Sequence, residues 1–358
     1  MSIIKNNKNI NSDILENIIT IIKNKVKIPM NNVKETGKYP VISQDRSFIA
    51  GYTDVDSFIA SSKSDPVILF GDHTTEVKFI DFDFCSGGDG TQIFRTKKDV
   101  DIMYLYYLMK NNFIKQDGYK RHFKDLKEKL VSYPNKEEQI KISNFLFNNN
   151  LKITNIKNII EKIEIRNKYY AKKLTSGKIL LNNNVEIIEY VFEDIINEHK
   201  KSKVMAGDSL KIGLYPFFNC SKKQTLYSNE YLIDDSVLLL STGGNPSVNY
   251  YNGKLSYSTD VWCLNSKYAK YLYYFYNANI EKIEQCFQGG GLQHLSKKDF
   301  KKIEIKIPNN DKDIQDIVDY LDRLNEEKEK IEKLLNLEEK RFEWLSDKLL
   351  SGEYIIED

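Results

Sequence analysis

Asp72 and the triplet Glu76-Val77-Lys78 have the spacing found in many nuclease centres. Two carboxylates and a lysine arranged in this way could hold a divalent metal and help water to cleave a phosphodiester. Triplets of this kind are frequent in a lysine-rich chain, however, and the second half of the sequence has no counterpart of this one. We therefore interpret these residues as part of the structure and not as a nuclease centre.

Histidine and cysteine, which commonly hold metals or act in catalysis, are scattered along the chain. They are His73, His122, His199 and His294, and Cys85, Cys220, Cys263 and Cys286. The cysteines form no Cys-x-x-Cys pair, and the histidines have neither ligand-like spacing nor a Gly-x-Ser-x-Gly elbow to serve. We predict no metal site and no catalytic triad, and we expect the cysteines to be reduced thiols.

Glycine-rich loops that bind nucleotides are also missing from the sequence. It contains no Gly-x4-Gly-Lys phosphate loop, no Gly-x-Gly-x-x-Gly turn and no adjacent prolines, so the Pro-Pro-aromatic signature of amino-methyltransferases is excluded. Gln288–Leu292 contains three glycines in a row, and we interpret it as a mobile loop. By elimination, we predict a binding protein that is not an enzyme and needs no cofactor of its own.

The two halves of the chain repeat the same landmarks about 175 residues apart. Leu15–Ile19 returns at Phe192–Ile196, Gly37–Pro40 at Gly213–Pro216, Tyr104–Tyr107 at Tyr271–Tyr274, Asp125 and Pro134 at Asp299 and Pro308, and Thr175–Gly177 at Leu350–Gly352. A period of this length indicates a duplicated domain plus linker, not a solenoid of short repeats. A shared framework with diverged sequence in between is typical of a protein that does one physical job on two different targets.

The size and composition are those of a globular protein. The chain has 358 residues, of which 41% are hydrophobic and 29% charged, so we expect two or three domains, each with its own core. No run approaches 18 apolar residues, and residues 1–12 lack the apolar stretch of a signal peptide. We predict a cytoplasmic protein that does not associate with membranes.

The net charge of +2 hides two strongly charged segments. Residues 1–133 and 179–307 are nearly neutral, with formal charges of +3 and +1. Residues 134–178 carry 10 basic and 4 acidic side chains, whereas residues 308–358 carry 8 and 16. Both charged segments have apolar residues at alternating steps of three and four, from Ile142 to Leu174 and from Ile314 to Leu349. This heptad pattern predicts two long helices with coiled-coil seams.

Each predicted helix begins after a proline and ends at a Ser-Gly pair, where glycine can form a left-handed cap. The prolines are Pro134 and Pro308, and the caps are Ser176-Gly177 and Ser351-Gly352. About 40 residues at 1.5 Å each would give a rod of roughly 60 Å. Because one segment is basic and the other acidic, we expect the two helices to pair with each other, antiparallel, rather than with a second copy or another protein. The polar seam residues Asn149, Asn167, Lys328 and Glu338 would fix their register.

We therefore predict an α+β protein with two mixed α/β domains related by internal duplication. The domains would span residues 1–133 and 179–307, separated by a central spacer helix in residues 134–178 and a C-terminal one in residues 308–358. Buried strands are predicted at Pro66–Gly71 and Ser236–Ser241, and short Tyr/Leu-rich helices near 101–111 and 267–277. In this arrangement the two domains would lie at opposite ends of one antiparallel coiled coil.

The order of these landmarks resembles the specificity subunit of a type I restriction–modification system. The resemblance rests on Tyr39–Gln44, Ile49–Tyr52, Pro134 with Glu138-Gln139-Ile140, and a long helix ending at Leu174–Gly177, and it covers essentially the whole chain. The second copy departs from the family pattern at Asp313-Ile314-Gln315 and at Phe217–Cys220. These departures affect individual residues of the second half and not the expected architecture.

The resemblance implies a function for each part. Each globular domain would be a target-recognition domain that reads one half of a bipartite sequence in double-stranded DNA. The helices would set the unread gap between the half-sites and bind methyltransferase subunits, two per chain, with restriction/translocase subunits joining for cleavage. S-adenosylmethionine and ATP would be used by those partners and not by this chain.

DNA bases are read by amide, guanidinium and hydroxyl groups, while lysine and arginine contacts to phosphates fix position. Side chains of these types in the expected recognition stretches are the candidate DNA-binding residues. They are Ser43, Gln44, Arg46, His73, Thr74, Gln92, Lys120 and Arg121 in the first half, and Asn219, Ser221, Lys222, Lys223, Asn245, Ser247, Gln288, Gln293 and His294 in the second. Since both domains are nearly neutral, we expect the partners to supply much of the phosphate neutralisation.

Two other hypotheses remain open at this stage. One is a coiled-coil scaffold protein whose two domains bind proteins. The other is the detached recognition subunit of a fused methylase–endonuclease. The sequence does not give the half-sites, the spacer length or the presence of a nuclease partner, since methylation-only systems use the same subunit.

Overall fold

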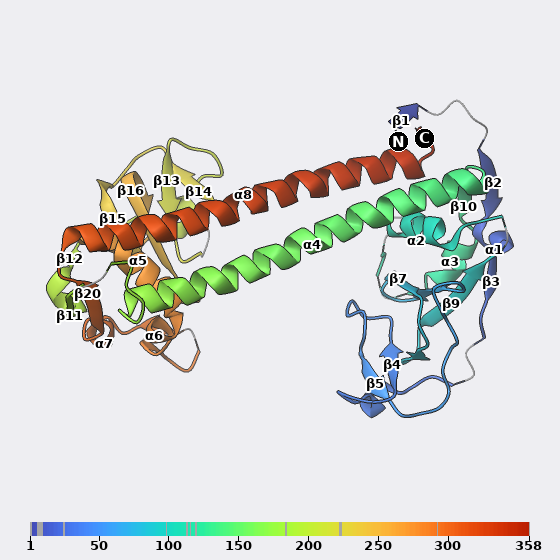
Figure 1. The fold of residues 1–358 in the computed structure, drawn as a ribbon, viewed down its shortest axis with the longest axis horizontal. Helices are drawn as coiled ribbons and strands as arrows, with labels where there is room; N and C mark the ends of the chain where they lie inside the picture. Colours follow the sequence, from blue (N-terminus) through green and yellow to red (C-terminus); the bar gives the residue numbers. More distant parts are fainter. Residues whose placement is uncertain are drawn as a thin grey trace. The chain divides into compact units, whose positions relative to one another are not determined.

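The computed structural model describes residues 2–5, 10–23, 26–97, 99–111, 114, 116–118, 120–182, 185–221, 224–291 and 293–357. The chain forms two compact units, and each long helix contributes to both (Figure 1). The first unit comprises residues 1–156 and 335–358, and the second comprises residues 157–334. Within the described residues, no helix is long and apolar enough to span a membrane.

The first unit contains short strands and helices from the N-terminal part of the chain. Its strands are β1 (Ser2–Lys5), β2 (Asn11–Ile14), β3 (Ile19–Ile21), β4 (Tyr39–Ile42), β5 (Gly51–Thr53), β6 (Val67–Gly71), β7 (Val77–Ile80), β8 (Cys85–Ser86), β9 (Thr91–Thr96), β10 (Leu130–Tyr133) and β21 (Tyr354–Glu357). Its short helices are α1 (Leu15–Ile18), the 3-10 turn η1 (Met30–Asn32), α2 (Ile102–Lys110) and α3 (Phe123–Lys127). The strands pair in the orders β3-β9-β6-β7, β5-β4-β8, β10-β2 and β1-β21.

The second unit is built from a larger sheet with the order β12-β17-β15-β16-β13-β14. Its strands are β11 (Ile187–Val191), β12 (Asn197–Glu198), β13 (Tyr215–Phe218), β14 (Leu226–Ser228), β15 (Ile233–Ser241), β16 (Val248–Tyr257), β17 (Val261–Asn265), β18 (Phe287–Gln288), β19 (His294–Leu295) and β20 (Glu304–Pro308). Its short helices are η2 (Phe192–Ile195), η3 (Ala206–Asp208), α5 (Ala269–Ala278), α6 (Ile280–Glu284) and α7 (Lys297–Phe300). Of the segment expected to be a mobile loop at Gln288–Leu292, Gln288 ends β18, residues 289–291 lie in neither a helix nor a strand, and Leu292 lies outside the described residues.

The central strand of each unit is buried on both faces. In β6, Ile68 and Phe70 pack with α2, whereas Leu69 packs into a second apolar core, because successive side chains of a strand point to opposite faces. In β15, Leu238 and Leu240 pack with α5, and Leu239 packs on the other side. The predicted buried strands and Tyr/Leu-rich helices are therefore present, although β15 begins three residues earlier than expected.

The two units have the same order of strand pairing. The order β3-β9-β6-β7 of the first corresponds to β12-β17-β15-β16 of the second, and each unit has one parallel step, β4 with β8 and β13 with β16. An ion pair is also repeated: Lys127 Nζ lies 2.5 Å from Glu16 Oε1, and Lys301 Nζ lies 3.2 Å from Glu193 Oε1. Lys127 ends α3, which precedes β10, and Lys301 follows α7, which precedes β20; their partners lie in α1 and η2.

The helices α4 (Lys136–Thr175) and α8 (Asp311–Leu350) are 40 residues long, as the heptads predict. In the first unit, Ile142 and Leu146 of α4 share a core with Leu349 of α8. In the second, Leu174 and Leu321 do the same. Within each unit the start of one helix thus packs near the end of the other, which is an antiparallel arrangement.

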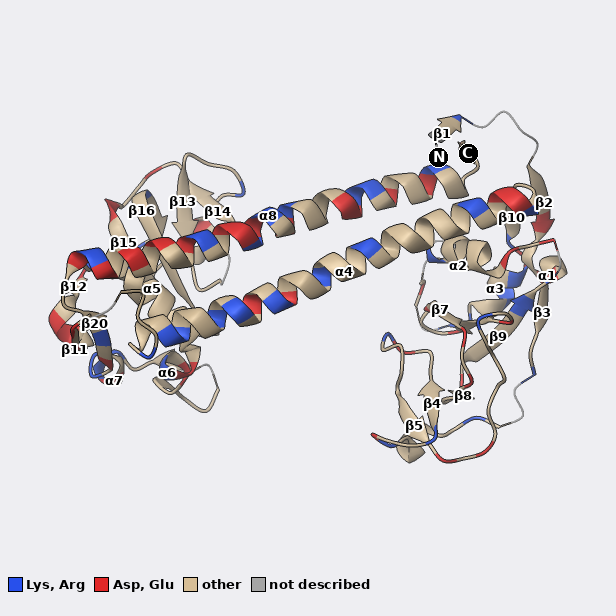
Figure 2. Cartoon of the chain, in the orientation of Figure 1, with Lys and Arg blue, Asp and Glu red and all other residues tan. Residues whose placement is uncertain are grey.

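Charged and polar side chains connect the two helices, whose opposite charges are visible in Figure 2. Lys152 Nζ lies 2.7 Å from Glu338 Oε1 in the first unit. In the second unit, Lys328 Nζ lies 2.7 Å from Glu164 Oε1, and Asn167 Nδ2 donates to the Leu324 carbonyl at 2.9 Å. Three of the four polar residues predicted on the seam therefore bond across it. The fourth, Asn149, bonds to the Phe145 carbonyl of its own helix.

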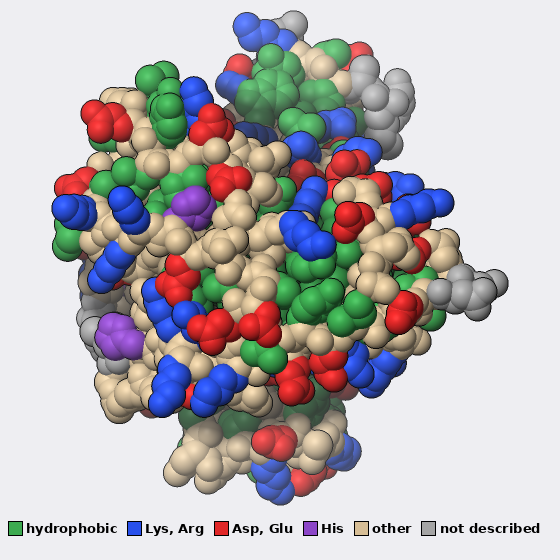
Figure 3. Space-filling model, turned by 90° about the vertical axis from the view of Figure 1, so that its left-hand side faces the viewer, with side chains coloured by type: hydrophobic (Ala, Val, Ile, Leu, Met, Phe, Trp, Pro, Cys, Tyr) green, Lys and Arg blue, Asp and Glu red, His purple; other side chains and the backbone are tan. Residues whose placement is uncertain are grey.

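Outside the helices the charges are balanced. The face of the molecule in Figure 3 has lysine or arginine side chains interspersed with aspartate and glutamate. This agrees with the formal charge of +1 for residues 179–307. A small net charge with local basic groups favours contacts at defined points over a general electrostatic attraction.

Both long helices end at a glycine with positive φ, as predicted. Gly177 has φ +70° and donates to the Leu174 carbonyl, while Lys178 donates to the Lys173 carbonyl, which is a Schellman cap. A Cβ on Gly177 would also lie 3.3 Å from Ile187 Cγ1.

Gly177→Ala is therefore expected to lower the free energy of unfolding by about 1 kcal/mol, measured by urea denaturation. Gly207→Ala is the matched control, because a Cβ there meets nothing within 4 Å. Equal effects of the two substitutions would contradict the proposed role of the cap.

Candidate nucleic-acid interface

Four of the candidate residues of the first unit lie together where β6 ends. The His73 main-chain N–H donates to Gln44 Oε1 at 3.2 Å, and Thr74 Oγ1 donates to the Gln44 carbonyl at 2.6 Å. His73 Nδ1 lies 3.2 Å from the Lys120 carbonyl oxygen. Three segments that are far apart in sequence, around residues 44, 73 and 120, thus meet at one edge of the sheet.

The Gln44 side chain is held in a defined orientation. Its Oε1 accepts a main-chain hydrogen bond, so the amide nitrogen is the end left to donate to a ligand. Gly90 allows this position, because a Cβ there would lie 2.7 Å from Gln44 Oε1. Ser43, Gln44, Asp45 and His73 border a hollow of about 210 Å³. An amide donor at the rim of a hollow suits recognition of an acceptor on a base edge.

Lys78 holds the loop that follows β4. Only 4% of its surface is exposed, and its Nζ donates to the carbonyl oxygens of Ser43 at 2.8 Å and Ser47 at 2.6 Å. Burial lowers the pKa of Lys78, although the carboxylates of Asp45 and Glu76 partly offset this effect. The lysine of the nuclease-like triplet therefore positions the loop of residues 43–48, a role that the sequence did not indicate.

Asp72, the first residue of the nuclease-like arrangement, also has a structural role. It is buried, and its Oδ1 accepts the Phe123 N–H at 2.8 Å. Its carbonyl oxygen accepts the His122 N–H at 2.8 Å and lies 3.0 Å from His122 Nδ1. These bonds attach the segment carrying Lys120 and Arg121 to the end of β6. Within the described residues, no group of three metal-ligating side chains is present.

The remaining candidates of the first unit differ in exposure. Arg46 and Arg121 are exposed, and Gln92 is half-buried on β9, opposite Phe70. Ser43 is buried and its hydroxyl donates to Asp45 Oδ2 at 2.7 Å. Ser43 therefore orients Asp45 and does not present its own hydroxyl at the surface.

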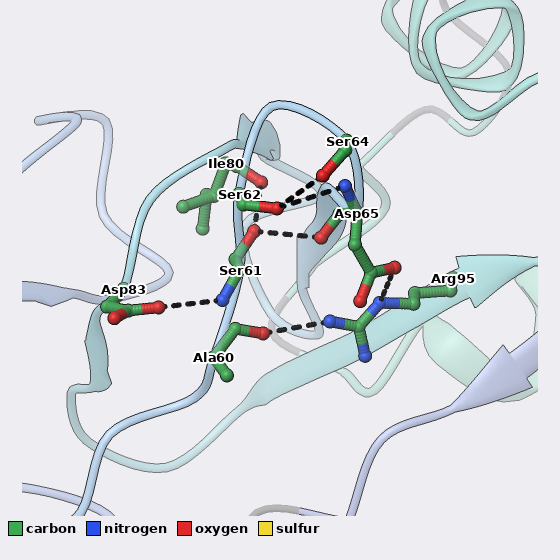
Figure 4. Close-up of polar contacts among 8 residues, drawn as sticks. All are labelled: Ala60, Ser61, Ser62, Ser64, Asp65, Ile80, Asp83 and Arg95. Atoms are coloured by element: carbon green, nitrogen blue, oxygen red, sulfur yellow. Dashed lines mark hydrogen bonds and ion pairs between the residues drawn. The ribbon is translucent and has the colours of Figure 1, made fainter.

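The loop between β5 and β6 is attached to the sheet by the network drawn in Figure 4. Arg95 of β9 donates to the Ala60 carbonyl at 2.8 Å and lies 2.7 Å from Asp65 Oδ1. Ser61 Oγ donates to the Ile80 carbonyl at 2.8 Å. Arg95 therefore pairs with groups of its own unit. In this it differs from Arg46 and Arg121, which remain exposed.

In the second unit, three candidates border one hollow of about 430 Å³ at the corresponding edge. They are Asn219, Ser221 and Asn245. Asn219 Oδ1 accepts the Ser221 N–H at 2.9 Å, which shapes the turn after β13. Ser247, in the turn after β15, is buried, and its N–H donates to Ser241 Oγ at 2.9 Å. The segment after β13 and the turn after β15 thus meet as their counterparts do in the first unit.

The hairpin formed by β18 and β19 approaches the same turn. His294 forms a β-bridge with Gly243, and the Leu295 N–H donates to the Thr242 carbonyl at 3.0 Å. Gln288 Nε2 donates to Asp299 Oδ2 at 2.8 Å, while Gln293 is exposed. Lys222 and Lys223 lie outside the described residues.

Sequence reasoning also missed three lysines beside this edge. Lys200, Lys201 and Lys297 border a hollow of about 310 Å³ together with His294 and Trp262. They come from segments 97 residues apart in the sequence. No local pattern connects them, and only the pairing of β12 with β17 brings residues near 199 beside Trp262.

Comparison with known proteins finds a family that is similar to part of this chain. Residues 178–338 match the type I restriction modification DNA specificity domain. A stretch of 99 residues is 28% identical to the type I restriction enzyme EcoDI specificity subunit of Escherichia coli, covering 27% of this chain and 22% of that protein. Over these residues the chain is similar to type I specificity subunits.

A second specificity subunit of Escherichia coli, that of EcoR124I/EcoR124II, is 26% identical over 115 residues, or 31% of this chain and 28% of that protein. These alignments span about a quarter of the curated relatives. The structural similarity covers more of the chain than these sequence alignments do. The type I restriction–modification S subunit from M. genitalium covers 99% of this chain and 98% of its own, with a TM-score of 0.67 and 17% identity. A chain from a solved type I restriction–modification complex gives a TM-score of 0.52 at 11% identity, covering 95% and 97%.

Proposed function

We propose that this specificity subunit reads a bipartite sequence in double-stranded DNA, one half with each unit, and itself catalyses no reaction. The observation that carries the proposal is the convergence, in both units, of polar segments at the end of the central strand. Amide, hydroxyl and imidazole groups meet there on an edge held by main-chain hydrogen bonds. Such groups read base edges when a rigid scaffold presents them.

The two units are, in this proposal, two target-recognition domains that arose by duplication. The repeated strand order and the repeated ion pairs of Lys127 and Lys301 support this. The domains would span residues 1–133 and 179–307, with spacer segments at 134–178 and 308–358. The paired helices would form an antiparallel coiled coil, and their salt bridges and heptads support that role.

The resemblance to type I specificity subunits suggests which partners this chain would bind. One similar chain comes from a structure of the assembled type I system. We propose that methyltransferase subunits, two per chain, bind this subunit and are directed by it to DNA in the cytoplasm, with restriction subunits joining them. The partners would supply S-adenosylmethionine chemistry and much of the charge that neutralises the phosphates.

The chain is expressed in a methylation-free host together with the methyltransferase subunit encoded by the neighbouring gene. We expect methylation in a two-part motif around a fixed gap. Modified-base sequencing of the host DNA would detect this mark and give the target. Omission of the chain should abolish it. An active methyltransferase that leaves the same mark without this chain would overturn the proposal and favour a scaffold function.

A further inference from the structure

The hollow of about 310 Å³ in the second unit has a strong excess of positive charge. Lys200, Lys201 and Lys297 border it, and Glu198 is its one carboxylate. Three lysines and one glutamate give a formal charge of +2 before either neighbouring histidine is protonated. A concave site of this sign attracts an anion.

Glu198 is already committed to groups around it. Its Oε2 accepts the Trp262 indole N–H at 2.8 Å and lies 3.6 Å from Lys297 Nζ, while its Oε1 lies 2.8 Å from Lys301 Nζ. Within the described part of the chain, neither Lys200 nor Lys201 has a carboxylate within ion-pair distance. The two lysines at the rim therefore have charge available for a ligand.

Lys297 lies beside the Trp262 ring at this site. Its Nζ lies 4.6 Å from the centroid of the Trp262 ring, and Trp262 itself is buried. Burial lowers the pKa of Lys297, and Lys201 and Lys301 nearby lower it further, although Glu198 opposes them. The proximity of these like charges is unfavourable in the absence of a ligand, and a bound anion would relieve it.

The main chain holds the rim lysines in place. The His199 N–H donates to the Cys263 carbonyl at 3.0 Å, and the Tyr257 hydroxyl donates to the Lys200 carbonyl at 2.6 Å. The segment is thereby attached to β17 at His199 and to β16 at Lys200. Because the main chain is already ordered, the ordering cost of binding a ligand would be only the conformational entropy of the side chains.

The site adjoins the proposed reading edge. His294 and Thr242 both border it, and the same two segments carry the contacts that join the β18–β19 hairpin to the turn after β15. An anion bound here would lie next to any base held by that turn.

We propose that this hollow binds a phosphate group of the DNA backbone beside the half-site read by the second unit. The inference rests on the proposed DNA-reading function and adds to it the contact that would fix the position of the DNA. Phosphate contacts of this kind position the protein on the duplex and carry no sequence information. Lys200 and Lys201 would contact the phosphate directly, and Lys297 would add a third positive charge to the site.

The test is a Lys200→Ala/Lys201→Ala double variant of the full chain in its complex with the methyltransferase subunits. Binding to a fluorescent duplex that contains the mapped target is measured by anisotropy over a range of salt concentrations. Each phosphate contact contributes about 0.9 to the slope of log K against log salt. We expect the slope to fall by about 0.9 and the ratio of specific to non-specific affinity to stay unchanged.

The matched control is Lys203→Ala/Lys211→Ala, which removes the same charge from exposed lysines of the same unit that do not border the hollow. A double variant whose slope equals that of wild type would overturn the inference while leaving the proposed function intact. Absence of target-specific binding by the wild-type complex would instead overturn the proposed function. A titration with inorganic phosphate distinguishes a site for a free anion from a site for the DNA backbone. Binding is followed by the fluorescence of Trp262 in a Trp344→Phe chain. If phosphate saturates the hollow but the double variant leaves the salt slope of DNA binding unchanged, the hollow is a site for a free anion and not for the DNA backbone.

Discussion

Lys78→Met is expected to weaken binding of the target DNA by roughly 30- to 150-fold. The ammonium group donates to the carbonyl oxygens of Ser43 and Ser47, and hydrogen bonds to a charged group contribute about 1.5 kcal/mol or more each. Loss of both would release the 43–48 loop, which carries Gln44 and Arg46. The loop would then have to be ordered again on DNA binding, at a cost of about 2 to 3 kcal/mol. This free energy corresponds to the expected loss of affinity.

The same substitution should change the stability of the first unit much less. Methionine has a similar length, and it removes the cost of burying an ammonium group at the same time as it removes the hydrogen bonds. A folded variant with weakened DNA binding would thus distinguish loop positioning from general unfolding. Affinity is measured by anisotropy on the mapped target, and folding by circular dichroism.

Lys78→Arg is the matched variant, because it keeps a buried cation that can donate to both carbonyls. It is expected to retain more affinity than Lys78→Met. Unchanged affinity in the methionine variant would show that the 43–48 loop does not contribute to DNA binding.

Local patterns predicted the framework of this protein well. The length of both helices follows from heptads, because helical periodicity is visible within a short window of sequence. The glycine caps at 177 and 352 follow from residue type alone, since positive φ favours glycine. The repeat was detectable because these landmarks return at nearly constant spacing.

The contacts that shape the candidate interface were not predictable in the same way. Lys78 and Ser43 are 35 residues apart, and their bond depends on the register of β6 with β7. The lysines around Trp262 depend likewise on the pairing of β12 with β17. Strand register is a non-local property, so the sequence indicated which residue types were present near the edge without indicating which of them point inward.

One apparent departure from the family pattern has a structural explanation. Glu138 of α4 accepts the Ile356 N–H, in the segment after α8, at 2.7 Å. Asp313 of α8 accepts the Asn182 side-chain amide, in the segment after α4, at 2.6 Å. The shorter acid reaches a side chain where the longer one reaches the main chain. Both carboxylates therefore attach the end of one long helix to the start of the other.

Gln139 is the residue of this region whose loss should cost the most stability. It is fully buried, its Oε1 accepts the Asp101 N–H at 2.7 Å, and its Nε2 donates to the Asp99 and Pro134 carbonyls at 3.0 and 2.9 Å. These bonds join the start of α2 to the start of α4. The second copy has Ile314 at this position, packed against its apolar core, so no amide is needed there.

Gln139→Leu is expected to lower the free energy of unfolding of the first unit by about 3 to 4 kcal/mol. Three hydrogen bonds at about 1 kcal/mol each are lost, and the half-buried Asp101 N–H loses its partner. Denaturant titration followed by circular dichroism measures the change, and hydrogen exchange of peptides around residue 101 assigns it to this unit. Gln315→Leu is the control on α8, because the exposed Gln315 bonds only to Asp319 of its own helix. Equal losses in the two variants would show that the buried amide contributes no more than a surface one, and that the junction of α2 with α4 is held by apolar packing alone.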